Sequence, residues 1–123
     1  MKLYFQEVPE LAARIYQRMS PEARSDTIWA RTVSEAINVL RDYKDSLSIV
    51  YLSYRPYIPV YHQQEKVSGL AVAEYIRKMF NPEDFSDCTF IIETENPIAA
   101  KWMRDMLMRK GFKTKLQRLG TYK

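Results

Sequence analysis

The stretch LSIVYL, residues 47–52, decides the fold class of this chain. Five of its six residues are apolar, and the run has the length of a β-strand. A strand with one face in solvent alternates apolar and polar residues, so an almost continuous apolar run is typical of a central parallel strand covered on both faces. Consecutive parallel strands are joined by crossovers that usually contain a helix. We therefore expect strands and helices to alternate on both sides of this run.

The flanking sequence has this alternation. Residues 2–6, 27–30 and 89–92 are short and rich in apolar or aromatic side chains, and residues 112–117 alternate apolar with polar side chains, as in an edge strand. Between these runs, apolar residues at spacings of three or four predict four amphipathic helices. The helices are expected to begin near Pro9, Thr32, Ser68 and Pro97, with a polar connector at residues 20–26.

Several helix ends carry specific signals. Thr32 followed three residues later by Glu35 is the pattern of a capping box, and Gly111 has the position of a helix C-cap. Pro97 suits the first position of a helix, and Asn96 suits the N-cap before it. The last helix, residues 97–110, is expected to turn five side chains toward the core: Ala99, Trp102, Met103, Met106 and Leu107.

The predicted order of elements is β-α-β-α-β-α-β-α-β. It indicates a single α/β domain spanning residues 1–123, a three-layer sandwich with a mostly parallel five-stranded sheet and no helix after strand 5. The leading strand order is 2-1-3-4-5, as in flavodoxin-like and receiver-like domains. In such sheets ligands bind beyond the carboxyl ends of the strands, here at residues 6–7, 53–55 and 93–96.

The composition is that of a soluble globular protein, with 46% hydrophobic and 28% charged residues. No apolar stretch approaches the length of a membrane span, and the N-terminus MKLYFQEV lacks the pattern of a secretory signal peptide. A cytoplasmic location is therefore expected. The single cysteine, Cys88, lies in an apolar run, which predicts a small buried side chain rather than a reactive thiol.

Positive charge is concentrated toward the C-terminus. Residues 99–123 contain eight Lys or Arg and one acid, a net charge of +7, whereas residues 1–98 contain eleven bases and fourteen acids, a net charge of −3. A basic end favours an anionic partner, either nucleic acid or an acidic protein surface. The alternative is a solvated helix face and an edge strand kept soluble by lysines. Nucleic acid would be contacted by Lys101, Arg104, Lys113, Lys115 and Arg118.

Residues 53–66, SYRPYIPVYHQQEK, form a long segment without a strand or helix pattern. The segment is rich in apolar and aromatic side chains of the kind enriched in protein interfaces. Alternatively, the same side chains fold back and cover the end of the sheet. The candidate protein-binding residues are Tyr54, Tyr57, Ile58 and Tyr61.

The sequence lacks the patterns of common catalytic and metal sites. His62 is the only histidine, and no second histidine or cysteine stands at ligand spacing from it, so no zinc site is expected. The three glycines, Gly69, Gly111 and Gly120, do not form a phosphate-binding loop, and there is no nucleophile elbow. We therefore expect neither a metal nor a cofactor.

Five segments of the chain resemble the cyclic-phosphate-processing receiver family: KLYFQE at 2–7, RTVSEAINVL at 31–40, YLSYR at 51–55, SGLAVAEYI at 68–76 and ETENP at 93–97. The resemblance covers most of the chain and implies a receiver-type fold. In that family the first strand commonly ends in two aspartates, Ser-Leu-Asp-His-Asp follows the third strand, Thr-Gly precedes the next helix, and His-Ser-x-Asn-Pro forms a junction. The residues kept here, or closely substituted, are Ser68, Gly69, Thr94, Asn96 and Pro97.

The chain departs from the family at the positions that would carry chemistry. Gln6 and Glu7 replace the paired aspartates, residues 53–55 read Ser-Tyr-Arg in place of Asp-His-Asp, and Glu93 replaces the junction histidine. Clustered carboxylates that would hold Mg²⁺ or accept a phosphoryl group are therefore missing. The strand ends still offer a candidate anion or polar-ligand pocket, or else a salt bridge that replaces the lost metal. The candidate pocket residues are Glu7, Arg55, Glu93 and Asn96.

These observations leave three hypotheses for function. The first is a non-catalytic, receiver-like binding module, that is, a pseudoenzyme that regulates another protein by binding it. Such a module is expected to form a homodimer through its edge strand. It would suit a phage-encoded effector of a host protein. The second is nucleic-acid binding through the basic C-terminal helix and strand. The third is a divergent hydrolase of cyclic phosphates, with Glu7 and Glu93 as its acid and base.

Overall fold

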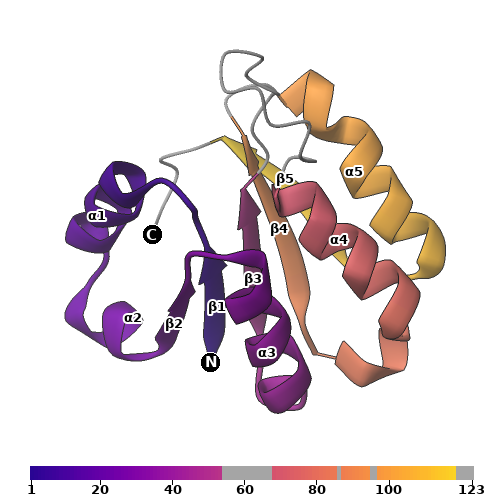
Figure 1. The fold of residues 1–123 in the computed structure, drawn as a ribbon, viewed down its shortest axis with the longest axis horizontal. Helices are drawn as coiled ribbons and strands as arrows, with labels where there is room; N and C mark the ends of the chain where they lie inside the picture. Colours follow the sequence, from indigo (N-terminus) through magenta and orange to yellow (C-terminus); the bar gives the residue numbers. More distant parts are fainter. Residues whose placement is uncertain (54–67, 86, 95–96, 119–123) are drawn as a thin grey trace.

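The computed structural model describes residues 1–53, 68–85, 87–94 and 97–118. Its strands form one sheet in the order β2-β1-β3-β4-β5, and every strand pairing is parallel (Figure 1). The predicted α/β class and strand order are therefore confirmed. The strands are β1 (Lys2–Phe5), β2 (Thr27–Ala30), β3 (Ile49–Ser53), β4 (Thr89–Thr94) and β5 (Thr114–Arg118).

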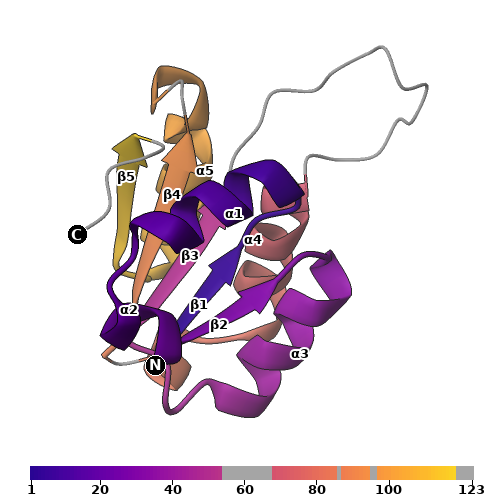
Figure 2. The ribbon, with the colours of Figure 1, turned by 90° about the vertical axis from the view of Figure 1, so that its left-hand side faces the viewer.

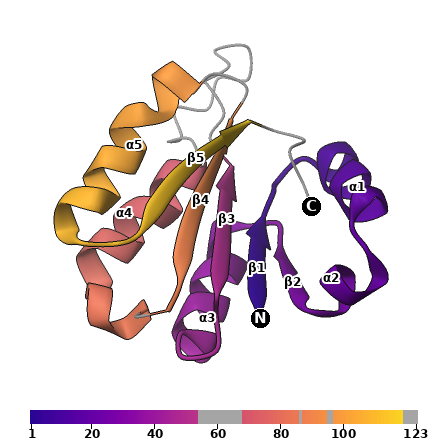
Figure 3. The same ribbon diagram turned by 180° about the vertical axis from the view of Figure 1, so that it is seen from behind.

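Helices on both faces of the sheet make the fold a three-layer one. α1 (Pro9–Arg18) and the short α2 (Pro21–Ser25) lie on one face, whereas α3 (Val33–Tyr43), α4 (Ser68–Met79) and α5 (Pro97–Lys110) lie in a row on the other (Figure 1 and Figure 3). A 3-10 helix, Pro82–Phe85, precedes β4. Within the described residues no helix follows β5. None of the described helices is long and apolar enough to cross a membrane.

The main hydrophobic core lies between the sheet and helices α3, α4 and α5. Side chains of a strand alternate between the two faces, so every second strand residue points to this side. The helices contribute Leu40 from α3, Ile76 from α4, and Met103 and Leu107 from α5. The strand residues of the core are Leu3, Phe5, Ala30, Val50, Leu52, Phe90 and Ile92.

The opposite face of the sheet is covered unevenly. α1 packs beside Trp29 of β2, whereas Figure 2 shows β5 with no helix across it. On this face Tyr4 is buried between Trp29 of β2 and Tyr51 of β3, and the ring centroids of these two residues lie 4.9 and 4.7 Å from that of Tyr4. We call Trp29, Tyr4 and Tyr51 the aromatic row. It extends the apolar covering from α1 to the middle of the sheet.

The observed helix ends agree with the signals in the sequence. Thr32 Oγ1 accepts a hydrogen bond from the Glu35 N–H at 3.1 Å, and the Glu35 carboxylate accepts one from the Arg31 N–H at 2.8 Å. The second bond reaches one residue further back than in the usual capping box. Gly111 has a φ of 110°, as expected for a C-cap glycine. Pro97 is the first residue of α5, and Asn96 lies outside the described residues.

Three local expectations were wrong. Residues 20–26 contain a helix rather than only a connector, because the Ser20 hydroxyl accepts a hydrogen bond from the Ala23 N–H at 3.2 Å and caps α2. Trp102 is 47% exposed and does not belong to the core. The third and fifth strands begin two residues later than expected, at Ile49 and Thr114.

The start of α4 is in close contact with the end of β3. A Cβ atom placed on Gly69 would overlap the carbonyl oxygen of Ser53 and lie 2.9 Å from its carbonyl carbon. Only glycine therefore fits at this position without a shift of the backbone. The contact fixes the point at which the chain returns to the sheet after β3.

Replacing Gly69 with alanine is expected to destabilise the protein, although alanine is normally the better helix former by about 1 kcal/mol. The added methyl group would push α4 away from β3, and overpacking of this kind typically costs about 1–3 kcal/mol. Urea unfolding followed by circular dichroism measures the change in the free energy of unfolding. Ser34→Ala, at an exposed position of α3, is the control and should stay within about 0.5 kcal/mol of the wild type. A stabilised Gly69→Ala protein would contradict the contact.

Candidate functional site

Polar side chains form a row across the carboxyl end of the sheet. Ser53, Glu93 and Gln117 are register neighbours on β3, β4 and β5. Gln6 comes directly after β1 and continues the row, because the last residue of β1 pairs with Leu52. These four side chains point to the face that carries α1, since the residues before them in the strands point into the main core. We call Gln6, Ser53, Glu93 and Gln117 the polar row.

Hydrogen bonds within the protein hold Gln6, Glu93 and Gln117 of the polar row. The Gln117 side-chain amide donates to Glu93 Oε2 at 3.2 Å, and Gln6 Oε1 accepts a hydrogen bond from the Val8 N–H at 3.2 Å. Glu93 is only 1% exposed, and a buried carboxylate depends on polar contacts because removing a charge from water is costly. These hydrogen bonds indicate that the polar row has a structural role at the strand ends.

The predicted polar pocket lies only partly within the described residues. Arg55 and Asn96 lie outside them, Glu93 belongs to the polar row, and Glu7 is exposed just after β1. Two inter-strand spacings, about 10 Å, separate β1 from β4. Glu7 is exposed whereas Glu93 is buried, and their role as an acid and base pair stays a prediction. Among the described residues, no group of three or more His, Cys, Asp or Glu side chains is arranged to hold a metal ion.

The candidate protein-binding residues Tyr54, Tyr57, Ile58 and Tyr61 lie outside the described residues. Their contact with another protein therefore stays a prediction.

The candidate nucleic-acid contacts are divided between the two sides of the sheet. Lys101 and Arg104 are on α5, where Arg104 forms an ion pair with Asp105 at 3.2 Å. On β5, Lys115 points to the α1 side, and Arg118, three residues further on, points to the α5 side. Lys113 is exposed just before β5. A nucleic acid would therefore have to wrap around the edge of β5 to reach all five side chains.

The sequence interpretation missed the outer side of α5. Ile98 is 88% exposed, Met108 50% and Trp102 47%, although all three are large apolar side chains. Ile98 and Trp102 are four residues apart and are neighbours on the helix surface. Lys101 and Arg109 are exposed on the same helix.

A signal for this surface was present in the sequence. A helix with one buried face carries its apolar residues mainly on that face. In α5 the buried face is already filled by Ala100, Met103 and Leu107, so Ile98 and Trp102 form a second apolar stripe. The expectation that Trp102 faces the core failed because spacing alone does not assign a residue to one stripe or the other.

Comparison with known proteins identifies no relative, since no protein-family model and no curated protein matches the chain. The function is therefore inferred from the fold and from the surfaces described above.

Cys88 is buried just before β4, and this burial raises the pKa of its thiol from 9.0 to about 12. Because the reactive form of cysteine is the thiolate, such a thiol is expected to be inert in the folded protein. The raised pKa also has a consequence for stability. The contribution of this group is fully present below pH 9.0 and is lost as the pH rises toward about 12, where the folded protein would have to bury a charge.

Labelling with iodoacetamide at about pH 8 tests the burial of Cys88. The native protein is expected to react at least about tenfold more slowly than the same protein in concentrated urea, because unfolding restores an ordinary thiol pKa. Mass spectrometry of timed samples measures both rates. Equal rates with and without urea would contradict the structure around β4.

Proposed function

We propose that this chain is a non-catalytic protein-binding module with a receiver-like fold, which regulates another protein. The observation that carries the proposal is the exposure of Ile98, Trp102 and Met108 on the outer side of α5. We call these three residues, together with Lys101 and Arg109, the α5 surface.

Large apolar side chains exposed on one helix favour binding of a partner. Removal of apolar surface from water contributes about 25 cal/mol per Å², and exposed apolar patches often mark interaction sites. Tryptophan is also among the residues that contribute most to interface energies. Ile98 and Trp102, on successive turns of the helix, would be the two anchors.

The charge on the α5 surface indicates the kind of partner. Lys101 and Arg109 are exposed, and neither forms an ion pair with a described residue. An acidic protein segment with apolar side chains, such as an amphipathic helix bordered by Asp and Glu, complements both the apolar anchors and these two cations. The phosphates of a nucleic acid would pair with the two cations, but they would gain little from contact with the apolar side chain of Ile98.

Site-specific photocrosslinking tests this surface. The photoreactive residue p-benzoylphenylalanine replaces Ile98 in one protein and Tyr43, which is exposed on α3, in a control. In a lysate of the source organism, position 98 is expected to give a discrete protein adduct and position 43 none. Trp102→Ala should lower the yield from position 98 by about fivefold or more, as expected for the loss of one interface anchor.

Charge reversal tests the acidic nature of the partner. Lys101→Glu combined with Arg109→Glu should abolish the adduct from position 98, whereas Arg14→Glu combined with Arg41→Glu, at exposed positions of α1 and α3, should not. An adduct that disappears after nuclease treatment would assign the surface to nucleic acid instead. Equal adducts from positions 98 and 43 would overturn the proposal.

The outer edge of β5, which pairs with no described strand, supports a homodimer as a companion proposal. β5 is the last strand in the sheet order, and the Lys113 carbonyl accepts a hydrogen bond from the Phe90 N–H of β4 at 2.8 Å. Backbone groups of successive residues point alternately to the two sides of a strand. The N–H and C=O of Leu116 therefore point away from the sheet, where a second β5 strand would pair with them.

Amide hydrogen exchange measured over a range of protein concentrations tests this dimer. Exchange at the Leu116 amide is expected to slow as the concentration rises, because pairing would supply an acceptor that no described neighbouring strand provides. The Trp29 amide points outward from β2, the other edge strand, since the Ala30 carbonyl faces β1 and accepts from the Gln6 N–H. Its exchange should not depend on concentration. Constant exchange at Leu116, with a monomer mass in sedimentation, would exclude the dimer.

A further inference from the structure

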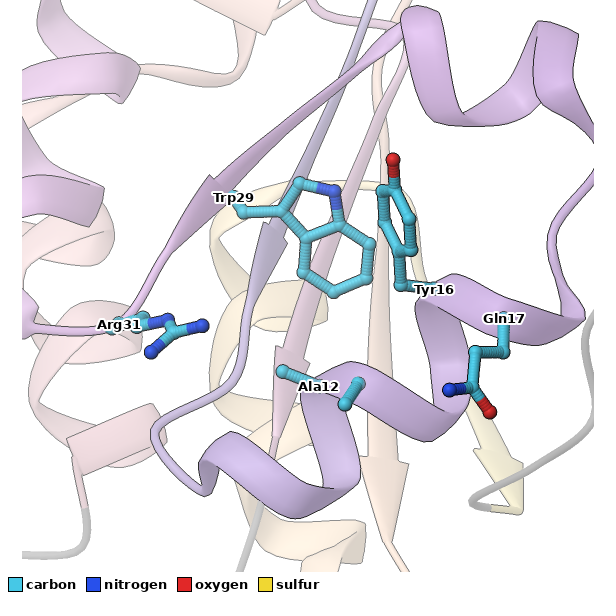
Figure 4. Close-up of a pocket in the computed structure, with 6 residues that line it drawn as sticks. Ala12, Tyr16, Gln17, Trp29 and Arg31 are labelled. Atoms are coloured by element: carbon cyan, nitrogen blue, oxygen red, sulfur yellow. The ribbon is translucent and has the colours of Figure 1, made fainter.

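α1 and β2 line a half-open cavity of about 370 Å³ on the side of the molecule away from α5. Figure 4 shows the rings of Trp29 and Tyr16 close together, with Arg31 and Gln17 on either side of Ala12 in this view. Cavities that bind small ligands typically measure about 300–1,000 Å³, with mostly apolar walls and a few polar groups. The lining residues are Ala12, Ala13, Tyr16, Gln17, Trp29 and Arg31.

The Trp29 indole is held in place by ring contacts. It stacks on Tyr4 with a centroid distance of 4.9 Å, and the Tyr16 ring lies edge-on to it at 6.0 Å. The indole N–H is buried and donates no hydrogen bond to a described residue. Ring contacts, rather than a hydrogen bond to a described residue, therefore hold this wall, and a molecule placed against the indole would change the environment of its N–H.

The Tyr16 wall is fixed by the helix that follows it. The Arg24 guanidinium of α2 lies 4.6 Å from the Tyr16 ring centroid. It also donates hydrogen bonds to the Tyr16 carbonyl at 2.7 Å and to the Gln17 carbonyl at 3.0 Å. These contacts tie the end of α1 to α2, so the aromatic side of the cavity is formed without a ligand.

Arg31 is the one charged residue of the cavity. Its backbone N–H donates to the Glu35 carboxylate at 2.8 Å, which fixes the chain at this point. Its guanidinium is exposed and forms no ion pair with a described residue, and none of the lining residues is acidic. The cavity therefore combines a fixed aromatic wall with an uncommitted cation.

We infer that this cavity binds a small molecule that carries a flat ring and a carboxylate. The ring would pack against Trp29 and Tyr16, where offset and edge contacts between rings are favourable. The carboxylate would accept two parallel hydrogen bonds from the Arg31 guanidinium. Ala12 and Ala13 leave the space for the ring because their side chains are small. This site is separate from the α5 surface, so either can fail without the other.

Indole N–H signals in ¹H–¹⁵N NMR spectra test the site directly. The chain has two tryptophans, Trp29 and Trp102, and Trp102→Phe assigns the two signals. Titration with phenylacetate is expected to shift the Trp29 signal in a saturable way, at about 1 mM or below for a ligand of this size. The Trp102 signal on α5 should not move and is the internal control. Phenylacetamide, which has the ring without the charge, should bind about tenfold more weakly.

Variants of the lining residues make the test specific. Arg31→Gln should weaken phenylacetate binding about tenfold through the loss of the charged hydrogen bonds, and Arg14→Gln on the same face of the fold should not change it. Ala13→Leu keeps a good helix former at an exposed position and should abolish binding by filling the cavity. Circular dichroism confirms that each variant is folded.

N-acetylphenylalanine, which has the ring and carboxylate of a peptide C-terminus, is titrated in parallel. Saturable binding of either compound with this dependence on Arg31 supports the site. Tighter binding of phenylacetate would indicate a free aromatic acid as the ligand, and tighter binding of N-acetylphenylalanine would indicate a peptide C-terminus. No saturable shift at tens of millimolar, or equal weakening by Arg31→Gln and Arg14→Gln, would overturn the inference.

Discussion

A parallel sheet has to be covered on both faces, and this constraint shapes the whole molecule. Helices α3, α4 and α5 meet it on one side with a continuous core. On the other side α1 extends over only part of the sheet (Figure 2), and the aromatic row continues the covering with stacked rings. Tyr51, at the end of this row, is half buried, and burial raises the pKa of its hydroxyl. Large aromatic rings on the strands thus cover part of this face of the sheet, as a further helix does in a fully covered sheet.

The uneven covering also separates the surfaces on which the proposals rest. Figure 1 shows α1 and α5 on opposite sides of the sheet, so the cavity beside Trp29 and the apolar residues of α5 face different directions. The polar row lies between them and forms hydrogen bonds within the protein, as between Gln117 and Glu93. A regulator with these features would recognise a protein on one side without using the carboxyl end of the sheet, where enzymes of this architecture usually bind their substrates.

Much of this architecture could be predicted from the sequence, because hydrophobic periodicity and cap residues are local signals. LSIVYL correctly indicated a central parallel strand, although the strand begins at Ile49. The strand-end rule selected Gln6, Ser53 and Glu93, but it did not select Gln117, because the rule points to the strands around the switch in strand order and Gln117 lies on the edge strand β5. The cavity could not be predicted, since it depends on the packing of α1 against β2, and no local pattern joins Ala13 to Arg31. Trp102 was misplaced because apolar spacing in α5 fits two stripes.

The contact between Ser53 and Gly69 has a consequence for the segment between them. The described residues on either side of segment 54–67, Ser53 and Gly69, are in direct contact, so the two ends of this segment are held close together by packing. The entropy of closing a flexible loop changes slowly with its length, by about 0.6 kcal/mol for each doubling. By this entropy alone, lengthening the segment between these two fixed ends is expected to change the free energy of unfolding by less than the about 1–3 kcal/mol expected for a methyl group added at Gly69.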